Sequence, residues 1–250
     1  MLPPMEVRKA VLMAAGRGTR LGALTANTPK PMLQVGGQPL ISHIVQGLVN
    51  AGLRHFIIVC GHLGDQVERW CDGFAAENPG VAVQAVRQRE LNGTAGALLA
   101  ARDLLRADHR FIFGWGDVLM DSANYVRFLA DAQTIECDLL LAVNAVDDPW
   151  RGAAVYVDSA MRVVRLVEKP PRGASTTRWN NAGLFAASRV IFDYLDRLEP
   201  SVRGERELPQ AIAAMIADGR SVRAFEVRGF WSDVGTPEDL AAARSHFAAR

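Results

Sequence analysis

The sequence has few of the residues that build disulfide-stabilised or zinc-binding proteins. Its 250 residues include three scattered cysteines without C-x-x-C spacing, which predicts neither a disulfide framework nor a zinc site. The five histidines form no grouping typical of nucleophilic catalysis. No run approaches the ~18 apolar residues of a membrane helix, and the N-terminus has no signal-peptide core. We therefore expect a cytoplasmic protein with no membrane partner.

The chain also lacks an excess of either charge. It has 28 lysines and arginines against 27 aspartates and glutamates, a net charge of +1. This balance argues against a chain-wide attraction to nucleic acid or to an anionic membrane, so any basic site must be local. The apolar content of 49% is ordinary for a globular protein, and the length is sufficient for a sizeable core.

Strand and helix patterns alternate along the first half of the chain. Five buried strands are predicted, at residues 10–15, 56–60, 81–86, 109–114 and 137–143. Helices are predicted between them, at residues 39–53, 63–74, 95–106 and 123–132. Such a run of βαβ units predicts a parallel sheet with helices on both faces, and ligands bind beyond the carboxyl ends of its strands.

The second half begins near residue 147 and has a different pattern. A hairpin is predicted at residues 152–167, followed by a loop at 170–178 whose composition is typical of a mobile segment that closes over substrate. Later elements are helices at 188–198 and 205–218 and a strand at 221–227. Asp121 is expected to cap the helix at 123–132, and Thr236 to cap the last helix, with Asp239 at its third position.

The segment that follows the first strand has the composition of a phosphate-binding loop. Gly16 and Gly18 let main-chain N–H groups approach a ligand closely, and Arg20 adds positive charge. Lys30 stands between two prolines that stiffen its loop. The glycine spacing differs from the dinucleotide fingerprint, and no Walker-type GxxxxGK[ST] string occurs. The glycines alone would fit an ordinary turn equally well.

A second chemical feature is Asp117, which follows the strand at 109–114 and two glycines. A carboxylate at the end of a buried strand suits Mg²⁺, a cation that prefers oxygen ligands. A turn cap is the alternative interpretation of this residue.

Several strings in this chain resemble the sugar-1-phosphate nucleotidylyltransferases, the NDP-sugar pyrophosphorylases. The N-terminal signature AAGRGTRL is followed by PKP, and then by GTAGA, GD, EKP, NAG and WSDVGTP in the family's order. The similarity runs from Val7 to about Ala243. Met13 stands where leucine is usual, and Trp115 replaces a smaller or polar residue, which makes the base or sugar pocket harder to predict.

The resemblance implies an α/β fold with a three-layer, Rossmann-like, mostly parallel sheet. This is the nucleotide-diphospho-sugar transferase (GT-A-like) architecture, with a smaller α+β subregion for the sugar. We expect one domain over residues 1–250, with a nucleotide-binding half at about 7–146 and a sugar-binding half at about 147–250. Because no hexapeptide repeats occur, the C-terminal β-helix of some relatives is not expected.

The resemblance also implies roles for individual residues. Catalysis is expected of Arg20, Lys30, Asp117 and Asp233. The cofactor is expected to be Mg²⁺, held by Asp117 and Asp233. Nucleotide binding is expected of Ala14, Ala15, Gly16, Gly18, Gln88, Gly93 and Thr94. The sugar phosphate is expected to contact Gly152, Glu168, Lys169 and Asn181. From its local sequence, Thr94 is also expected to cap the helix at 95–106.

The expected reaction joins a nucleoside triphosphate to a sugar 1-phosphate, giving an NDP-sugar and pyrophosphate. UTP or dTTP with a hexose 1-phosphate is the first choice, and GTP with mannose 1-phosphate is the alternative. A non-catalytic regulator that binds sugar nucleotides is a rival from another class. A choline-phosphate cytidylyltransferase is disfavoured, because the EKP and NAG strings suit a polyol better than a quaternary ammonium group. The oligomeric state stays open.

Overall fold

The apolar run that begins at Ala10 lies in an interior strand of the sheet. In the computed structural model, which describes residues 5–201 and 204–248, this strand is β1 (Val7–Ala14). It pairs in parallel with β4 (His55–Cys60) on one side and with β6 (Arg110–Trp115) on the other, and β5 (Ala82–Arg87) extends the group beyond β4. The middle of β1 is fully buried, as expected for a strand covered on both faces.

The other half of the sheet is largely antiparallel and completes the predicted mixed α/β architecture around the parallel strands. A ten-residue strand, β11 (Trp179–Ser188), runs antiparallel to both β6 and β8 (Leu139–Ala145). Beyond β8 lies β12 (Val222–Glu226), parallel to it, and the hairpin of β9 (Ala153–Val157) and β10 (Val163–Glu168) completes this side. Among the described residues, nine strands make up this sheet.

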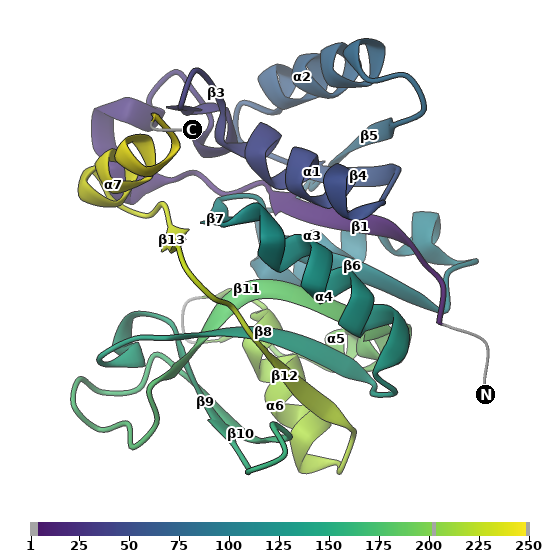
Figure 1. Cartoon of the computed structure of the whole chain (residues 1–250), viewed down its shortest axis with the longest axis vertical. Helices are drawn as coiled ribbons and strands as arrows, with labels where there is room; N and C mark the ends of the chain where they lie inside the picture. The colour runs from purple at the N-terminus through teal and green to yellow at the C-terminus, as the bar shows by residue number, and fades with distance from the viewer. Residues whose placement is uncertain (1–4, 202–203, 249–250) are drawn as a thin grey trace.

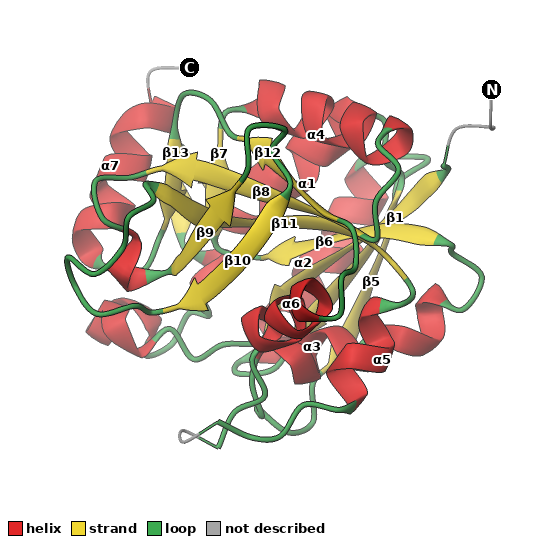
Figure 2. Cartoon of the chain, turned by 90° about the horizontal axis from the view of Figure 1, so that it is seen from below, coloured by secondary structure: helices red, strands yellow, loops and turns green. Residues whose placement is uncertain are grey.

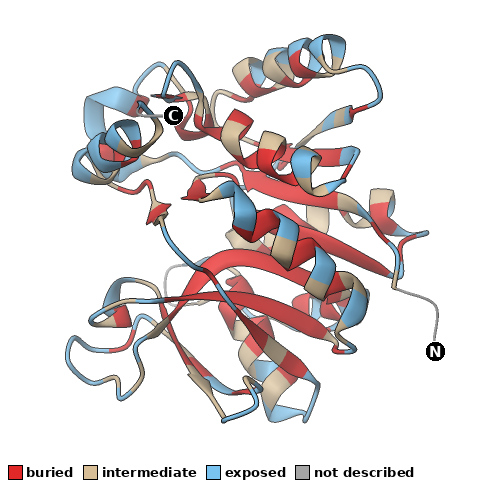
Figure 3. Ribbon diagram, in the orientation of Figure 1, coloured by how far each residue is buried: buried red, intermediate tan, exposed pale blue. Residues whose placement is uncertain are grey.

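Helices cover both faces of the sheet, so the predicted three-layer arrangement is confirmed (Figures 1 and 2). One apolar cluster packs α1 (Leu40–Ala51), α2 (Gly64–Glu77) and α4 (Ser122–Thr134) on one face. The other cluster packs α3 (Thr94–Ala100), α5 (Ile191–Asp196) and α6 (Leu208–Ala217) on the opposite face. Figure 3 shows the buried strands between these layers.

Four short strands and the last helix lie at one end of the molecule. β2 (Gln34–Val35) pairs with β3 (Gln38–Pro39), and the C-terminal helix α7 (Pro237–Ala248) packs against this pair. β7 (Val118–Met120) pairs with β13 (Trp231–Asp233). Among the described residues, none of the helices has both the length and the apolar character that crossing a bilayer requires.

Two predicted helices are shorter than their sequence pattern suggests. The helix predicted at 95–106 ends at Ala100, and a 3₁₀ turn (Arg102–Leu105) follows. The helix predicted at 188–198 is only α5, because β11 continues through Ser188, which pairs with Arg110 of β6. In both places tertiary pairing or a tighter turn overrides local helix propensity.

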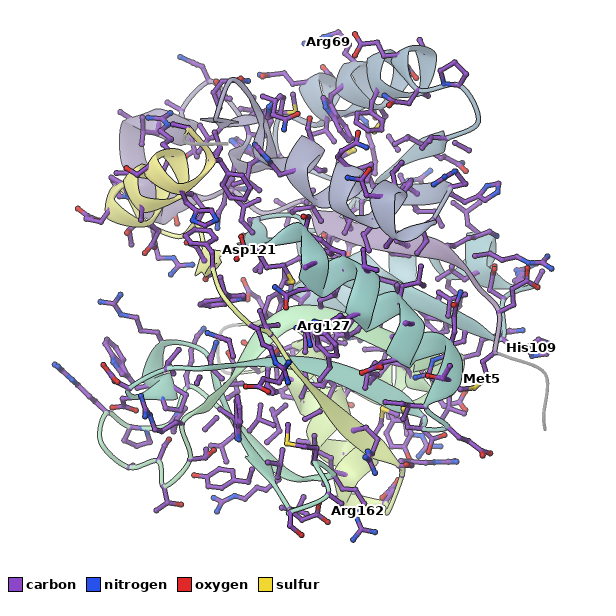
Figure 4. The ribbon with its side chains drawn as sticks, in the orientation of Figure 1. Met5, Arg69, His109, Asp121, Arg127 and Arg162 are labelled. Atoms are coloured by element: carbon purple, nitrogen blue, oxygen red, sulfur yellow. The ribbon has the colours of Figure 1, made fainter. Side chains whose placement is uncertain are left out.

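The prediction that Asp121 is the N-cap residue of α4 is confirmed, but its side chain makes no capping hydrogen bond. Asp121 occupies the N-cap position, but its carboxylate accepts hydrogen bonds from the Phe230 amide and from His246 Nε2, both at 2.9 Å. It therefore ties the start of α4 to the segment that leads into α7 (Figure 4). The Thr236 cap is confirmed, since the Asp239 amide donates to Thr236 Oγ1 at 3.2 Å and the Thr236 amide donates to Asp239 Oδ2 at 2.9 Å.

The packing of α1 on α4 predicts a specific effect on stability. A Cβ on Gly47 would lie 2.4 Å from the ring of Tyr125, which is 2% exposed. Gly47→Ala should therefore lower the free energy of unfolding by about 1–3 kcal/mol, because the steric cost exceeds the ~1 kcal/mol gain in helix propensity. Denaturant unfolding measures this change.

The matched control is Gly73→Ala in α2, where an added Cβ would meet no heavy atom within 4 Å. Without a clash, only the propensity gain remains, so this variant should be more stable by about 0.5–1 kcal/mol. If both variants were stabilised, the close packing of α1 on Tyr125 would be contradicted.

Candidate active site

The glycine loop after β1 lines a cavity of about 190 Å³ at the carboxyl ends of the parallel strands. Six of the predicted site residues line it: Ala14, Gly16, Gly18, Arg20, Lys30 and Asp117. A Cβ on Gly16 would meet no heavy atom within 4 Å, so its backbone is open to a ligand. Gly18 has a φ of 65° and packs closely on Thr25 and Lys30, which fixes the loop.

The polar centre of this cavity is the side chain of Lys30, which is 7% exposed. Its Nζ lies 2.5 Å from Asp117 Oδ2 and 3.3 Å from Asp233 Oδ1. Arg20 Nη2 lies 3.8 Å from the second oxygen of Asp233. Lys30 thus contacts both predicted catalytic aspartates directly, and the fourth predicted catalytic residue, Arg20, joins them through Asp233.

A short antiparallel ladder brings the two aspartates together. Asp117 directly precedes β7, and Asp233 is the last residue of β13, where it pairs with Val118. The Val234 amide donates to the carbonyl of Asp117 at 3.2 Å. Their proximity depends on this pairing of two distant segments.

The electrostatics of the group follow from its burial and its mixed charges. Burial by itself lowers the pKa of Lys30, but the carboxylates of Asp117 and Asp233 outweigh this effect and raise the pKa above its ordinary value. Lys30 is therefore a permanent cation at neutral pH. Desolvation and the nearby Asp117 carboxylate raise the pKa of Asp233, against the opposing effects of Lys30 and Arg20. An additional cation at this place would stabilise the ionised form of Asp233.

The residues predicted to meet the base lie near α3. Gln88 is 7% exposed, and its Nε2 donates to Asn92 Oδ1 and to the Gly93 carbonyl, both at 3.1 Å. The carbonyl of Arg206 accepts the Ala95 amide at 3.1 Å, and a Cβ on Gly93 would lie 2.4 Å from that same oxygen. What approaches the start of α3 is therefore another segment of this chain.

The prediction that Thr94 caps α3 was wrong. Gly93 holds the N-cap position, and Thr94 is the first helical residue. Its Oγ1 accepts a hydrogen bond from the Leu208 amide at 2.9 Å, so Thr94 anchors the start of α6.

Ala15 is 5% exposed and holds the turn before α2, because its carbonyl accepts the His62 amide at 3.2 Å. The nucleotide contacts expected of Ala15, Gln88, Gly93 and Thr94 stay predictions.

The residues predicted to bind the sugar phosphate lie together in the second half of the chain. The Lys169 amide donates to the Gly152 carbonyl at 2.7 Å, and Lys169 Nζ lies 3.7 Å from Glu168 Oε1. Lys169 has a φ of 44°, unusual for a residue with a side chain. Asn181 is 2% exposed, and its buried Nδ2 has no partner within the described residues. A polar ligand group would satisfy this donor.

Two tryptophans connect β11, which carries Asn181, to the segments that carry Asp117 and Asp233. The sequence pattern did not reveal this role. Trp231, two residues before Asp233, donates its Nε1 to the Ala182 carbonyl at 3.0 Å. Trp115, two residues before Asp117, covers Gly183, where an added Cβ would lie 2.1 Å from the indole. Gly183 has a φ of 78°, so the close approach and the backbone both require glycine.

The donor set suits a magnesium ion that shares its ligands with a substrate. Asp117 and Asp233 present carboxylate oxygens from two strands, which Mg²⁺ prefers. Within residues 5–201 and 204–248, no group of three or more His, Cys, Asp or Glu side chains gathers at one point. The chain thus offers two carboxylates, which matches the usual Mg²⁺ site completed by substrate phosphates and water.

The profile of the family described as nucleotidyl transferase matches residues 9–250. The UTP–glucose-1-phosphate uridylyltransferase AglF of Haloferax volcanii is 32% identical over 235 residues, covering 92% of this chain and 93% of AglF. The bifunctional protein GlmU of Methanococcus maripaludis is 31% identical over 239 residues, covering 95% of this chain but only 54% of GlmU. The chain therefore spans about half the length of that relative.

Solved structures show the same fold. The UTP-bound UGPase of Acinetobacter baumannii superposes with a TM-score of 0.82 at 25% identity, covering 97% of this chain and 93% of that one. A UDP-glucose pyrophosphorylase complexed with UDP-glucose gives a TM-score of 0.84 at 21% identity, covering 98% and 100% of the two chains. With its fold, its glycine loop and this nearly full-length match, the chain belongs to the nucleotidyl transferase family.

Proposed function

We propose that this protein joins a nucleoside triphosphate to a sugar 1-phosphate and releases pyrophosphate. The observation that carries this proposal is the grouping of Asp117, Asp233 and buried Lys30 beside the glycine loop. Lys30 and Asp117 line the same cavity as this loop. Phosphoryl chemistry needs positioned cations and a metal-binding carboxylate pair, and this cavity offers both. AglF, similar over nearly its whole length, is named as such an enzyme.

The proposed reaction is one displacement at phosphorus. An oxygen of the sugar phosphate attacks the α-phosphorus of the triphosphate, and the bond from that phosphorus to the bridging oxygen breaks. The bond's electron pair leaves with pyrophosphate. The attacking oxygen is already anionic at neutral pH, so the reaction needs positioning and charge neutralisation and no general base.

Residues of the glycine loop are assigned to the triphosphate, and residues of the second half of the chain to the sugar phosphate. Main-chain N–H groups near Gly16 and Gly18 bind the triphosphate, and the exposed guanidinium of Arg20 stabilises the leaving pyrophosphate. Lys30 draws the reacting phosphates into line. Lys169 fixes the sugar phosphate, with Gly152 and Glu168 beside it.

Asp117 and Asp233 are the residues that would hold Mg²⁺. When bound, the ion neutralises negative charge on the reacting phosphates. In its absence, the Lys30 ammonium compensates the two carboxylates, so the pair does not face an unbalanced repulsion.

UTP or dTTP is the proposed nucleotide, and a hexose 1-phosphate the proposed sugar. The names of AglF and of the UTP-bound UGPase support UTP for proteins similar to this one. GTP with mannose 1-phosphate remains the enzymatic alternative. A regulator that only binds sugar nucleotides is disfavoured, because such a protein would be expected to lose its catalytic charges, and Arg20, Lys30, Asp117, Lys169 and Asp233 are all present.

Pyrophosphate release from five triphosphates, dTTP included, against a panel of sugar 1-phosphates tests the proposal. We expect one preferred pair containing UTP or dTTP, and loss of release in EDTA. Asp117→Asn should lower turnover about 10²- to 10³-fold, by analogy with the loss of one transition-state contact. Triphosphate binding without release from any pair would favour the regulatory alternative instead.

Lys30→Met should separate the two roles of the lysine. Without the ammonium, the two carboxylates repel each other, so in EDTA the free energy of unfolding should fall by about 1–3 kcal/mol, reduced by the partial exposure of both aspartates. Mg²⁺ should restore more stability to this variant than to the parent, although turnover stays about 10²- to 10³-fold lower. Thermal unfolding with and without Mg²⁺ measures the effect.

Arg17→Gln is the control for this experiment. Arg17 is an exposed cation of the same loop, and within the described residues it forms no ion pair. Its loss should change stability by less than about 0.5 kcal/mol. An unchanged stability of Lys30→Met in EDTA would contradict the proposed charge balance.

A further inference from the structure

We infer that the sugar 1-phosphate used by this protein carries a second anionic group, bound by Arg151 and Arg172 beside Trp150. This inference rests on the proposed function and deepens it by naming the class of sugar. It starts from two unpaired guanidinium groups that lie next to the segment predicted to bind the sugar phosphate.

Two loops form the surface in question, and hydrogen bonds hold them together. The 3₁₀ turn Pro149–Arg151 leads directly into Gly152 and β9. The loop that follows β10 lies against it, because the Lys169 amide donates to the Gly152 carbonyl and the Gly173 amide donates to Asp148 Oδ2, both at 2.7 Å. Residues 148–152 and 169–173 are thus one fixed surface beside Lys169.

An exposed aromatic ring and two cations occupy this surface. Trp150 is 37% exposed, and both arginines are exposed. The Cζ atoms of Arg151 and Arg172 lie over the Trp150 ring, 5.2 and 5.7 Å from its centroid. The two guanidinium groups therefore converge on one indole although they come from different loops.

Two neighbouring basic side chains, Lys169 and Arg178, are paired with carboxylates, but these two arginines are not. Arg178 is paired with Asp147 at 3.0 Å, and Lys169 lies 3.7 Å from Glu168. The Gly173 amide donates to Asp148 Oδ2, and the buried Oδ1 of Asp148 has no hydrogen-bond partner among the described residues. Within the described part of the chain, neither Arg151 nor Arg172 forms an ion pair. Two guanidinium groups at one indole with no carboxylate partner raise the local positive potential, which favours a bound anion.

The chemistry of the guanidinium group narrows the class of ligand. Its planar N–H groups bind carboxylate or phosphate oxygens in pairs, which adds direction as well as charge. Gly152 and Lys169, predicted to hold the sugar and its phosphate, lie on the same surface. Because Arg151 directly precedes Gly152 and Arg172 follows Lys169 by three residues, an anionic substituent away from C1 is the sugar group that we assign to the arginines, with the 1-phosphate at Lys169.

A comparison of three sugars tests the inference with the preferred triphosphate. Values of kcat/KM are measured for glucose 1-phosphate, glucuronic acid 1-phosphate and glucose 1,6-bisphosphate. We expect at least one anionic sugar to be preferred over the neutral one by about 10-fold or more. The last two sugars distinguish a carboxylate from a second phosphate as the recognised group.

The arginine variants assign the preference to this surface. Arg151→Gln and Arg172→Gln should each reduce the preference for the anionic sugar, and the double variant should lower it by about 10- to 100-fold, mainly through KM. The rate with the neutral sugar should stay unchanged. Arg165→Gln is the matched control, because Arg165 is also exposed and lies over an aromatic ring, 5.2 Å from the centroid of Tyr156 on the neighbouring hairpin.

Three results would overturn the inference. The parent protein could show no preference for either anionic sugar. The arginine variants could slow neutral and anionic sugars equally, or Arg165→Gln could have the same effect as they do. In each case turnover of the neutral sugar would leave the proposed function intact. If no sugar phosphate released pyrophosphate, the proposed function would fail and this inference with it.

Discussion

The ammonium of Lys30 lies between two carboxylates that belong to distant parts of the chain, and the site depends on this arrangement. A buried cation is stabilised by anions that compensate it, and two nearby ionised carboxylates repel each other unless a cation compensates them. Lys30, Asp117 and Asp233 satisfy both conditions together. In the proposed function, the same two aspartates, both held at Lys30, would bind a divalent cation.

The rest of the fold maintains this grouping. β1 ends at the glycine loop, and β6 leads to Asp117, so both strands deliver their residues to the same edge of the sheet. The ladder of β7 and β13 adds Asp233, and the capped helix α7 holds the segment that follows it. Trp231 then links this ladder to β11, which also carries Asn181, a residue predicted to contact the sugar. The antiparallel β11 therefore connects the two halves of the candidate site.

Much of the parallel half of the fold could be predicted, because long apolar runs and amphipathic spacing are local signals. The strands at β1, β4, β5, β6 and β8 are confirmed. The antiparallel course of β11 could not be predicted, since strand direction depends on the partner strands and not on the strand's own residues. The roles of Asp121 and Thr94 were missed for a related reason. Each residue has the local pattern of a cap, yet each side chain binds an amide of a distant segment.

The sequence by itself determined the chemical groups of this protein: a glycine loop, a lysine held between prolines, two aspartates and an EKP segment, each recognisable from neighbouring residues. Only the tertiary structure decided which of them meet. Strand pairing placed Lys30 between Asp117 and Asp233. The Arg206 carbonyl accepts the Ala95 amide at the start of α3. Arg151 and Arg172 both lie over the indole of Trp150. The physical reason is that distances between groups far apart in the chain are set by strand pairing and packing, which no local pattern specifies.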